Sequence, residues 1–444
     1  MTRVLCWNVN NFSSNGFYPP PGARPRSVGD DGDYGVPAAT QDANDRKAVL
    51  LATINAVQPD LISIVEVKPG MVGLAPASLV LDQASYRLLG DIQGLGFAGA
   101  AEYRLVPPLV SGHNRRAEGI AVYYRRDRLQ FLGPWGWSGA AGMPIAALPG
   151  GETAEYPLPW DNGLPAREIP AGWMNEGHWE DELAGQCAFV NGVPLDFPEA
   201  PHRKPWLTCF RDFSNPMNER LVKLLSFHAP PGIDSVEGVD ALADILEVAI
   251  NPLAANEVRC VIGDFNVSSL DAGDADEAYG PLEEAGFTMR FAPHLAGVGN
   301  QLPERGYYVT FLKRRQDSTP WVSDDHGTKV YGYPPFDYMS DNAIDNALTI
   351  YGAGAGAPAN ATVVNPVTHS PYNVSPPPGM VPPGTIAVPS AMNEPNVFHY
   401  APPGENGIDG FDMNADDLTN DFQEWANYTH IRSCSDHLPI ALDI

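Results

Sequence analysis

The sequence predicts a protein of the α/β or mixed sandwich class, because apolar runs of strand type alternate with helical stretches along its 444 residues. Apolar positions at helical spacing place one helix over residues 42–60, which Pro59 closes, and a second helical stretch covers residues 236–254. Gly, Pro and Asp crowd the segment after the first strand, so this strand runs into a long loop. The predicted strands are residues 3–9, 61–67, 118–125, 219–229 and 257–265.

Three long segments do not follow this alternation, and they are rich in Pro, Gly, Trp and Asn with weak periodicity. They cover residues 133–202, 292–340 and 352–412. Loops of this length inside a compact domain are usually functional or disordered. Because strands of one sheet resume after each segment, we expect a single domain over residues 1–444 in which the three segments are insertions.

The chain is strongly acidic, with 27 basic residues against 54 acidic ones and a formal net charge of -27. Long-range attraction to nucleic-acid phosphates or to an anionic membrane surface is therefore unfavourable. A metal ion and a few arginines in a cleft can nevertheless reverse the potential locally. The composition thus disfavours a nucleic-acid substrate without excluding it.

The five cysteines are widely spaced and include no C-x-x-C pair, so zinc and redox sites are not predicted. Cys6 and Cys260 lie inside apolar strand-like runs, where a reduced cysteine behaves as a small hydrophobic residue. The N-terminus lacks the apolar region of a signal peptide, and no apolar run reaches the roughly eighteen residues of a membrane span. We therefore expect a cytoplasmic protein without a membrane span, and nothing in the sequence implies an obligate protein partner.

Polar side chains recur at one kind of position, at or just beyond the end of an apolar strand. Strand ends are where α/β folds place ligands. Hydrolysis of a phosphoester needs a cation, a positioned water and a group that stabilises the leaving oxygen, and carboxylates, amides and histidines serve these purposes. Each motif alone is equally compatible with an ordinary hydrogen-bonded turn. The residues are Asn8, Asn10, Glu66, Asp264, Asn266, Asp436 and His437.

Several sequence blocks, taken in order, resemble the endonuclease/exonuclease/phosphatase superfamily. The blocks are LCWNVNNF, PDLISIVEV, GIAVYYR, LLSFHAPPG, VIGDFNVSSLD, AIDNALT and SDHLPI. The resemblance implies a deoxyribonuclease-like, four-layered sandwich, in which two packed mixed β-sheets are flanked by helices. It also implies metal-dependent phosphoester hydrolysis with Mg²⁺, or with Mn²⁺ or Ca²⁺ in its place.

The resemblance assigns three residues to the metal. Glu66 would be the main ligand, Asn8 would lie beside it and orient the metal shell or the phosphate, and Asp436 would complete the set. Carboxylate and amide oxygens suit a hard cation such as Mg²⁺. A carboxylate flanked by Val65 and Val67 would also be costly to bury without a partner.

The remaining roles concern water, phosphate and leaving group. The resemblance implies that Asp264 orients or deprotonates the attacking water and that Asn266 holds a phosphoryl oxygen. His437 would contact the phosphate, and Asp345 would fix the tautomer of His437 by a hydrogen bond. Asp341 is the competing candidate for this last role. The general acid for the leaving oxygen would be His228.

The chain also departs from parts of the family pattern. Many abasic-site endonucleases carry an aspartate where Asn10 stands, and Val65 replaces the usual glutamine before the metal-binding glutamate. Asn10 lacks the charge to anchor a second cation, which leaves it as a candidate for substrate binding. Arg116 and Arg203 could contact a phosphate, although arginines are common on protein surfaces.

The substrate class is left open between a nucleic acid and a small phosphoester. A nuclease is the first interpretation, because much of the superfamily cleaves nucleic-acid phosphodiesters. A phosphodiesterase or phosphatase for a small-molecule or lipid head-group ester is the alternative, and the acidic charge favours it. A catalytically inactive binding protein is the third hypothesis. Such a protein would be expected to lose Glu66, Asp264 or His437, all of which are present.

Overall fold

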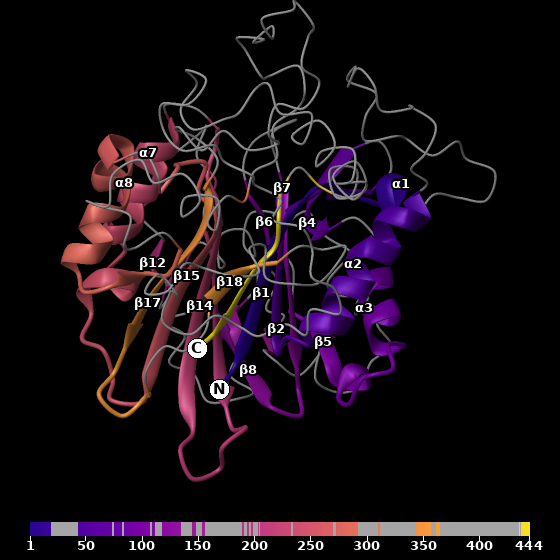
Figure 1. The fold of residues 1–444 in the computed structure, drawn as a ribbon, viewed down its shortest axis with the longest axis horizontal. Helices are drawn as coiled ribbons and strands as arrows, with labels where there is room; N and C mark the ends of the chain where they lie inside the picture. The colour runs from indigo at the N-terminus through magenta and orange to yellow at the C-terminus, as the bar shows by residue number, and fades with distance from the viewer. Residues whose placement is uncertain are drawn as a thin grey trace, which may run out of the picture.

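The structure of the chain is a computed structural model. The structure describes residues 1–18, 43–72, 75–81, 84–106, 109–111, 118–134, 144–147, 153–155, 189–190, 193–194, 197–198, 203, 205–231, 234–269, 272–291, 310, 343–356, 361–364, 435 and 437–444. Within these residues two large β-sheets form the centre of the molecule (Figure 1).

The first sheet is mixed, because β1 and β2 run parallel while the remaining pairs are antiparallel. Its last strand, β19, pairs beside β1, so the two termini of the chain lie next to each other (Figure 1). In spatial order the strands are β18 (Ala361–Val363), β19 (Ile440–Asp443), β1 (Arg3–Phe12), β2 (Leu61–Val67), β7 (Glu118–Arg125) and β5 (Tyr103–Leu105), with β6 (Leu109–Ser111) also paired to β7.

The second sheet repeats this plan, with one parallel pair, β14 and β15, at its centre. Parallel neighbours end at the same edge, and this places the ends of β14 and β15 side by side. In spatial order the strands are β16 (Thr288–Met289), β17 (Asp345–Tyr351), β15 (Glu257–Asp264), β14 (Arg220–His228), β13 (Trp206–Asp212) and β8 (Leu129–Pro134).

The other elements are helices and three two-stranded hairpins. The helices are α1 (Ser14–Phe17), α2 (Ala43–Val57), α3 (Ala84–Gln93), α7 (Asp234–Asp240) and α8 (Ala272–Glu284), with 3₁₀ turns at Ala100–Glu102 and Ala241–Asp244 and a π turn at Leu246–Ile250. The hairpins pair β3 (Pro69–Val72) with β4 (Ala75–Leu81), β9 (Pro144–Ala147) with β10 (Thr153–Glu155), and β11 (Phe189–Val190) with β12 (Val193–Pro194).

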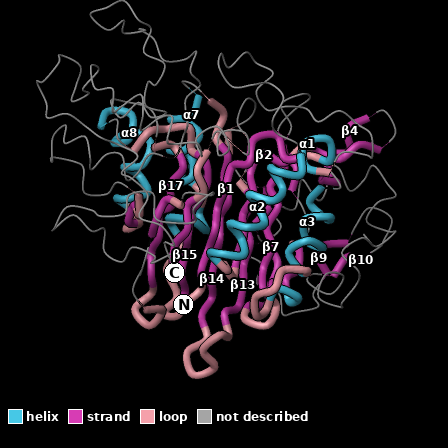
Figure 2. The backbone as a smooth tube through the Cα atoms, turned by 45° about the vertical axis from the view of Figure 1, so that its right-hand side comes forward, coloured by secondary structure: helices cyan, strands magenta, loops and turns pink. Residues whose placement is uncertain are grey.

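Three separate apolar clusters hold four layers together. The first fills the space between the two sheets, the second joins the first sheet to α2 and α3, and the third joins the second sheet to α7 and α8. Along β1, Cys6 belongs to the first cluster and Trp7 to the second, as the alternation of side chains in a strand requires. The predicted sandwich of two mixed sheets flanked by helices is therefore confirmed (Figure 2).

Several predicted elements match closely, and others need correction. Strands 61–67 and 118–125 have the predicted bounds. The helical stretch predicted over residues 236–254 is wrong as one continuous helix: it starts at Asp234, and Ile245 takes an extended conformation that breaks it. The segment 352–412, predicted as an insertion, contains β18, which is an edge strand of the first sheet.

Two general predictions concern cysteines and the membrane. Cys6, Cys209 and Cys260 are buried free thiols, as predicted for core positions.

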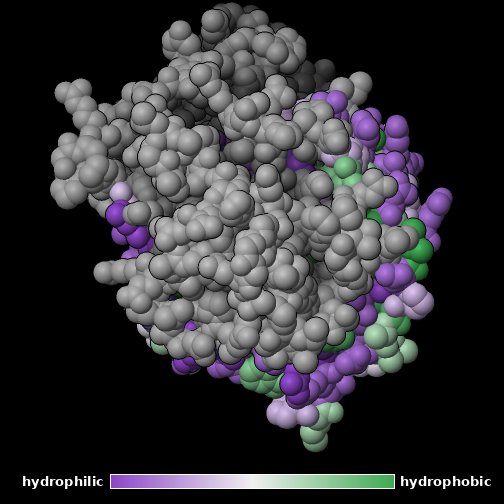
Figure 3. All heavy atoms as spheres, turned by 180° about the vertical axis from the view of Figure 1, so that it is seen from behind, coloured by the Kyte–Doolittle hydropathy of each residue, from purple (hydrophilic) through white to green (hydrophobic). Residues whose placement is uncertain are grey.

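Among the described helices, none is long and apolar enough to cross a bilayer. The coloured part of the surface in Figure 3 is mostly hydrophilic. In the described ranges, the exposed large hydrophobic residues are scattered ones, namely Met1, Met217 and Ile250.

An ionic network closes the end of the sheets where β2 and β14 begin. Asp60 is 1% exposed. It accepts hydrogen bonds from the backbone N–H of Arg3 at 2.9 Å and from Arg128 at 3.0 Å, and Arg125 approaches it at 3.5 Å. Arg3 in turn pairs with Asp443, so the network ties β1 to both of its neighbouring strands. Removal of any one partner of such a buried carboxylate would strongly destabilise the fold, because it would leave a buried charge without compensation.

Asp212 links the two sheets at the same end. Its Oδ2 accepts hydrogen bonds from Thr2 at 2.7 Å and from Arg220 at 2.6 Å. Arg220 also donates to the carbonyl of Ile444 at 3.0 Å. Burial alone would raise the pKa of Asp212, but hydrogen bonds from Ser214, Arg220 and Thr2 outweigh it and lower the pKa to about 2.

We expect Asp212→Asn to lower the free energy of unfolding by about 2 kcal/mol at neutral pH. Because the folded pKa lies below the ordinary value of 3.8, the ionised group stabilises the fold above that value and loses this contribution as pH falls toward 2. Urea unfolding at pH 7 and pH 3 should show the difference between wild type and variant shrinking to about half. An equal difference at both pH values would contradict this account.

Candidate functional site

The ends of several strands meet at one edge of the space between the sheets. His228 at the end of β14 stands opposite Asp264 at the end of β15. Asp345, at the start of β17, pairs with Asp264 from the other side. All three are buried, and each continues the face of its strand that contributes to the cluster between the sheets. The first sheet brings Asn8 of β1 to the same edge.

Asp264 is the centre of this group. Its carboxylate is 1% exposed. Oδ2 accepts a hydrogen bond from Asn8 Nδ2 at 2.9 Å and lies 3.4 Å from His228 Nε2 and 3.6 Å from His437 Nε2. Oδ1 accepts from the backbone N–H of Asn266 at 2.9 Å. One carboxylate thus faces an amide and two imidazoles.

His437 is held from behind by a second carboxylate. Its Nδ1 lies 2.7 Å from Asp345 Oδ2, which leaves Nε2 facing the centre. Burial and the nearby charge of Asp264 raise the pKa of Asp345, and His437 offsets part of that rise. Thr310 supports the pair, since its hydroxyl accepts from the backbone N–H of Asp345 at 3.0 Å. This arrangement fixes both the tautomer and the direction of the His437 ring.

The segment that carries His437 is attached directly to β1. Ser435 donates to the carbonyl of Asn8 at 2.5 Å, and its hydroxyl accepts from the backbone N–H of His437 at 3.0 Å. Trp7 Nε1 donates to the carbonyl of His437 at 2.8 Å. Asn8 and His437, which are far apart in the sequence, therefore share one local scaffold.

His228 has its own charged partners, Glu118 and Arg203. Glu118 Oε2 lies 2.8 Å from His228 Nδ1, and Arg203 Nη1 lies 3.1 Å from the same nitrogen. Arg203 also pairs with Glu118 at 3.2 Å. Burial alone would lower the pKa of His228, but Glu118 and Asp264 outweigh it and raise that pKa. Burial would raise the pKa of Glu118, yet His228, Arg203 and Lys68 lower it.

Backbone strain concentrates at the same edge. Outside glycine, the positive φ angles of the described residues belong to Asn10 at 43°, Glu66 at 61° and Asn266 at 51°, together with Gln58 at 48°. Three of these four positions are predicted site residues. Left-handed backbone costs an L residue about 1 kcal/mol or more and persists where the surroundings enforce it, which is frequent at functional sites.

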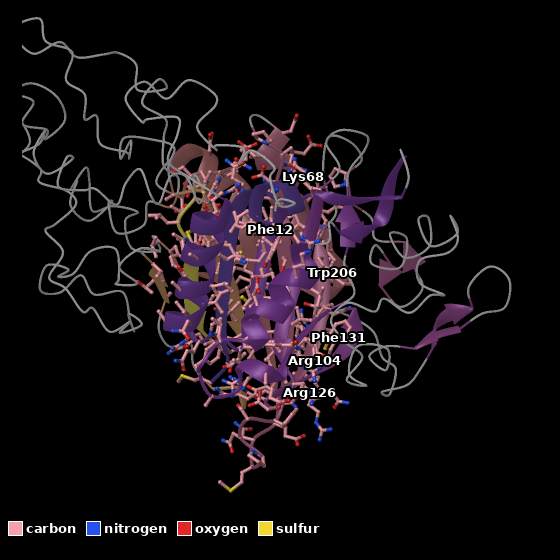
Figure 4. All side chains as sticks on the ribbon, turned by 90° about the vertical axis from the view of Figure 1, so that its right-hand side faces the viewer. Phe12, Lys68, Arg104, Arg126, Phe131 and Trp206 are labelled. Atoms are coloured by element: carbon pink, nitrogen blue, oxygen red, sulfur yellow. The ribbon has the colours of Figure 1, made fainter. Side chains whose placement is uncertain are left out.

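Asn10 and Glu66 mark where β1 and β2 lose their regular pairing. Asn8 pairs with Val65 and Phe12 pairs with Val67, so residues 9–11 stand opposite the single residue Glu66. Val65 belongs to the cluster between the sheets, whereas Val67 belongs to the cluster under the helices. The bulge at Glu66 thus interrupts the alternation of β2. Figure 4 labels Phe12 and Lys68 at this end of the sheet and Arg104 and Arg126 toward the other.

The residues at this edge suit a hard divalent cation. Glu66 is adjacent to the strand partner of Asn8, and a carboxylate beside an amide is the oxygen donor set that Mg²⁺ prefers. Asp264, Asp345 and His437 form a second group, with ligand atoms within 4.8 Å of one another. The His437 Nδ1 atom of that group is engaged by Asp345 at 2.7 Å. In this group His437 therefore has only Nε2 left to act as a ligand.

The structure brings together most, not all, of the residues that the sequence pointed to. Asn8, His228, Asp264, Asn266, Asp345 and His437 share the edge, while Asn10 and Glu66 flank it on the bulged strands. The predicted residues Asp436 and Arg116, and the competing candidate Asp341, lie outside the described residues.

Sequence reasoning missed Glu118, Thr310 and Ser435. Glu118 is the first residue of an apolar strand, so the rule that selected polar residues at or beyond strand ends did not select it. Ser435 directly precedes the aspartate and histidine of SDHLPI. Thr310 lies in a segment of weak periodicity, and no local signal marked it.

The fold and this cluster define an α/β sandwich with a buried carboxylate, amide and imidazole centre. The model of the Endonuclease/Exonuclease/phosphatase family matches residues 5–329, nearly three quarters of the sequence. The chain belongs to this family, whose members are phosphoester hydrolases and typically use divalent metals. Asp345 and His437 lie beyond the matched residues, and both are joined to the matched part of the site through Asp264, which pairs with Asp345 in the sheet and lies 3.6 Å from His437 Nε2.

Among curated proteins none matches the chain. Solved structures similar to it include an endonuclease/exonuclease/phosphatase family protein from Leptotrichia buccalis, with 10% identity, coverage of 100% of this chain and 99% of the other, and a TM-score of 0.42. A mannosyl-6-phosphatase of Bacteroides thetaiotaomicron has 12% identity, coverage of 100% and 99%, and a TM-score of 0.40. D. rerio TDP2 complexed with a single strand DNA product has 10% identity, coverage of 99% and 97%, and a TM-score of 0.38. These likenesses add no argument about substrate.

We predict that Glu66→Gly unfolds with a free energy about 1 kcal/mol higher than Glu66→Ala, because glycine adopts the left-handed backbone without strain. Both variants lose the carboxylate, so the comparison isolates the backbone. At Lys223, whose φ is not positive, Lys223→Gly should instead be less stable than Lys223→Ala. Urea denaturation of the four variants measures their free energies of unfolding. A Glu66→Ala variant as stable as Glu66→Gly would contradict the assigned strain.

Proposed function

We propose that the chain is a divalent-metal-dependent phosphodiester hydrolase and that nucleic acid is its foremost substrate class. The observation that carries the proposal is the convergence of Asn8, His228 and His437 on the buried carboxylate of Asp264. Such a group offers an acceptor for a proton of water, donors for phosphoryl oxygens and an acid for a leaving oxygen. Family membership supports the same reaction class.

Asp264 is the proposed group on the side of the attacking water. Its Oδ1 is held by the backbone N–H of Asn266 at 2.9 Å, and Asn8 holds Oδ2 at 2.9 Å. A carboxylate fixed by two donors cannot rotate freely, so it can align a water molecule and accept its proton. Asn266 itself donates through its side chain to the carbonyl of Ala229 at 2.9 Å, which keeps the turn after β15 in place.

His437 is the proposed donor to the phosphoryl oxygens. The contact with Asp345 at 2.7 Å stabilises the charged imidazole, whose Nε2 N–H then points to the centre. A preorganised cationic donor stabilises the negative charge of a phosphoryl group as the transition state forms. Asp345 acts in this scheme only through the histidine.

His228 is the proposed general acid. Burial alone would lower its pKa, but Glu118 and Asp264 outweigh burial and raise the pKa, which favours the protonated ring that a general acid requires. Transfer of the Nε2 proton to the departing oxygen would leave a neutral ring beside Glu118. Arg203 keeps Glu118 in position through its own ion pair at 3.2 Å.

Glu66, Asn8 and Asp436 are the proposed metal ligands. The cation would neutralise charge on the phosphoryl oxygens when it is bound. Its oxygen-rich ligand set favours Mg²⁺ or Mn²⁺ over zinc, which prefers nitrogen and sulfur ligands.

A small phosphoester is the second candidate substrate, and a specific observation favours it. The chain carries a net charge of -27, and the helices α7 and α8 contain acidic residues but neither Lys nor Arg. This negative charge would repel a long polyanion along much of its length, whereas a small ester would interact only with the reaction centre.

A substrate panel decides between the two candidates. Purified protein with Mg²⁺ or Mn²⁺ would be tested on plasmid DNA, single-stranded DNA, RNA, phosphomonoesters and lipid head-group diesters. Cleavage of nucleic acid that a chelator abolishes supports the nuclease. Activity confined to small esters would support the second candidate instead of the nuclease. If no ester is hydrolysed, the proposed reaction is wrong.

We expect Glu66→Gln and His437→Ala each to lower kcat on bis-(p-nitrophenyl) phosphate at least ~100-fold. Glu66→Gln removes a proposed metal ligand, so part of its loss should be recovered at high Mn²⁺, whereas the loss in His437→Ala should not be. Lys223→Gln, distant from the site, serves as control. Unchanged activity in both variants would remove the site assignment.

His228→Ala should depend on the leaving group. An alkoxide needs a proton to depart, whereas p-nitrophenolate leaves readily without one, so kcat should fall ~100-fold on a dinucleotide and less than ~10-fold on bis-(p-nitrophenyl) phosphate. His437→Ala should slow both substrates alike. Equal losses for both substrates in His228→Ala would exclude it as the general acid.

A further inference from the structure

The bulge at the end of β1 leaves two backbone carbonyls without partners in the sheet. Between the pairs Asn8–Val65 and Phe12–Val67 the register of β1 and β2 shifts. The carbonyls of Val9 and Asn10 fall in this gap. A buried backbone carbonyl without a hydrogen bond is costly, so the bulge needs a donor from elsewhere.

Arg46 supplies that donor from the first turn of α2. Its Nη2 lies 3.0 Å from the carbonyl of Val9 and 2.9 Å from that of Asn10. Arg46 is 4% exposed, and its guanidinium lies over the ring of Phe17, 4.3 Å from the centroid. A guanidinium buried in this way has little freedom to move, so it holds both carbonyls in fixed positions.

The bulge held by Arg46 in turn holds the side chain of Asn8. Asn10 has a φ of 43°, and its backbone N–H donates to Asn8 Oδ1 at 3.0 Å. With Oδ1 engaged, the amide nitrogen of Asn8 faces Asp264 at 2.9 Å. If the bulge relaxed, Asn8 Oδ1 would lose this donor and the amide could turn.

We propose that Arg46 is a positioning residue for the reaction centre, acting through the bulge at Asn10 on the amide of Asn8. The inference rests on the proposed function, in which Asn8 touches the reacting groups. It connects α2, on the outer face of the first sheet, to the buried edge between the sheets. Arg46 itself contacts neither Asp264 nor a histidine of the centre in any recorded hydrogen bond or ion pair among the described residues.

A double-mutant cycle tests the proposal in the full-length protein. The variants are Arg46→Met, Asn8→Ala and their combination, assayed for kcat and KM on bis-(p-nitrophenyl) phosphate with Mn²⁺. We expect Arg46→Met alone to lower kcat ~10- to 100-fold with KM changed less than ~3-fold. In the Asn8→Ala background the same change should lower kcat less than ~3-fold, because the amide it positions is already gone.

Arg259→Met is the matched control. Arg259 is also buried and also donates to backbone carbonyls, those of Val248 at 2.7 Å and Asn251 at 2.9 Å, near the opposite end of β15, and it pairs in addition with Glu257 at 2.5 Å. Its removal should lower the melting temperature at least as much as Arg46→Met and leave kcat unchanged whether or not Asn8 is present. Arg46→Lys keeps the positive charge and a hydrogen-bond donor. It takes the place of Arg46→Met in the double-mutant cycle if Arg46→Met does not fold.

Binding of Mn²⁺ alone, measured by calorimetry, gives a readout independent of turnover. Arg46→Met should weaken it several-fold in wild type and leave it unchanged in Asn8→Ala. Equal fold-losses of kcat in both backgrounds would overturn the positioning role while leaving the proposed function intact. An Asn8→Ala variant with full activity would likewise overturn the positioning role, since Arg46 could then not act through Asn8, whereas a wild-type protein that hydrolyses no ester would overturn the proposed function itself.

Discussion

The burial of one carboxylate, that of Asp264, is the constraint on which the site depends. At 1% exposure this charge has lost almost all of its water, and such a loss is tolerated only where donors replace the solvent. Asn8 and the backbone of Asn266 supply two hydrogen bonds, and two imidazoles approach within 3.6 Å. The ends of β1, β14 and β15 and the C-terminal segment all contribute to meeting that single requirement.

Each of the two buried imidazoles is in turn supported by a carboxylate that contacts its Nδ1 atom. His437 is backed by Asp345, and His228 is backed by Glu118 together with Arg203. Each of the three carboxylates Asp264, Asp345 and Glu118 thus lies against an imidazole, and Arg203 adds a permanent positive charge beside Glu118. Pairing of this kind offsets the cost of burying ionisable groups, and it leaves each ring with one nitrogen directed at the centre.

The amino-acid sequence predicts the parts of this arrangement that depend on local patterns. Apolar runs bounded by Asp60 and Pro69 define β2, and the rule that polar residues follow strand ends selects Asn8, Asp264 and Asn266. Asp345 and His437 were associated through family resemblance alone, since they lie 92 residues apart and nothing local connects them. Their contact requires β17 and the C-terminal segment to meet across two sheets.

The features that could not be predicted depend on tertiary contacts. Nothing in the sequence NVNNF shows that β1 loses its register at Asn10, because the bulge is stabilised by Arg46 from a helix. Glu118 can be recognised as a partner of His228 only in the folded protein, where β7 of one sheet faces β14 of the other. The break at Ile245 likewise contradicts a helical pattern that looks continuous, since packing of α7 and the following turns on the second sheet overrides local periodicity.

Most of the left-handed backbone lies at the end of the sheets opposite the ionic network. The network of Asp60, Asp212 and Arg220 lies where β2 and β14 begin, whereas three of the four left-handed residues other than glycine, Asn10, Glu66 and Asn266, lie at or near the opposite ends of their strands. A sandwich secured at one end by buried hydrogen bonds between its sheets can tolerate several kinks at the other without opening. Because the kinks interrupt the regular alternation at Asn10 and Glu66, directly after Asn8 and its strand partner Val65, removing the strain would also remove the geometry that distinguishes this edge from an ordinary sheet end.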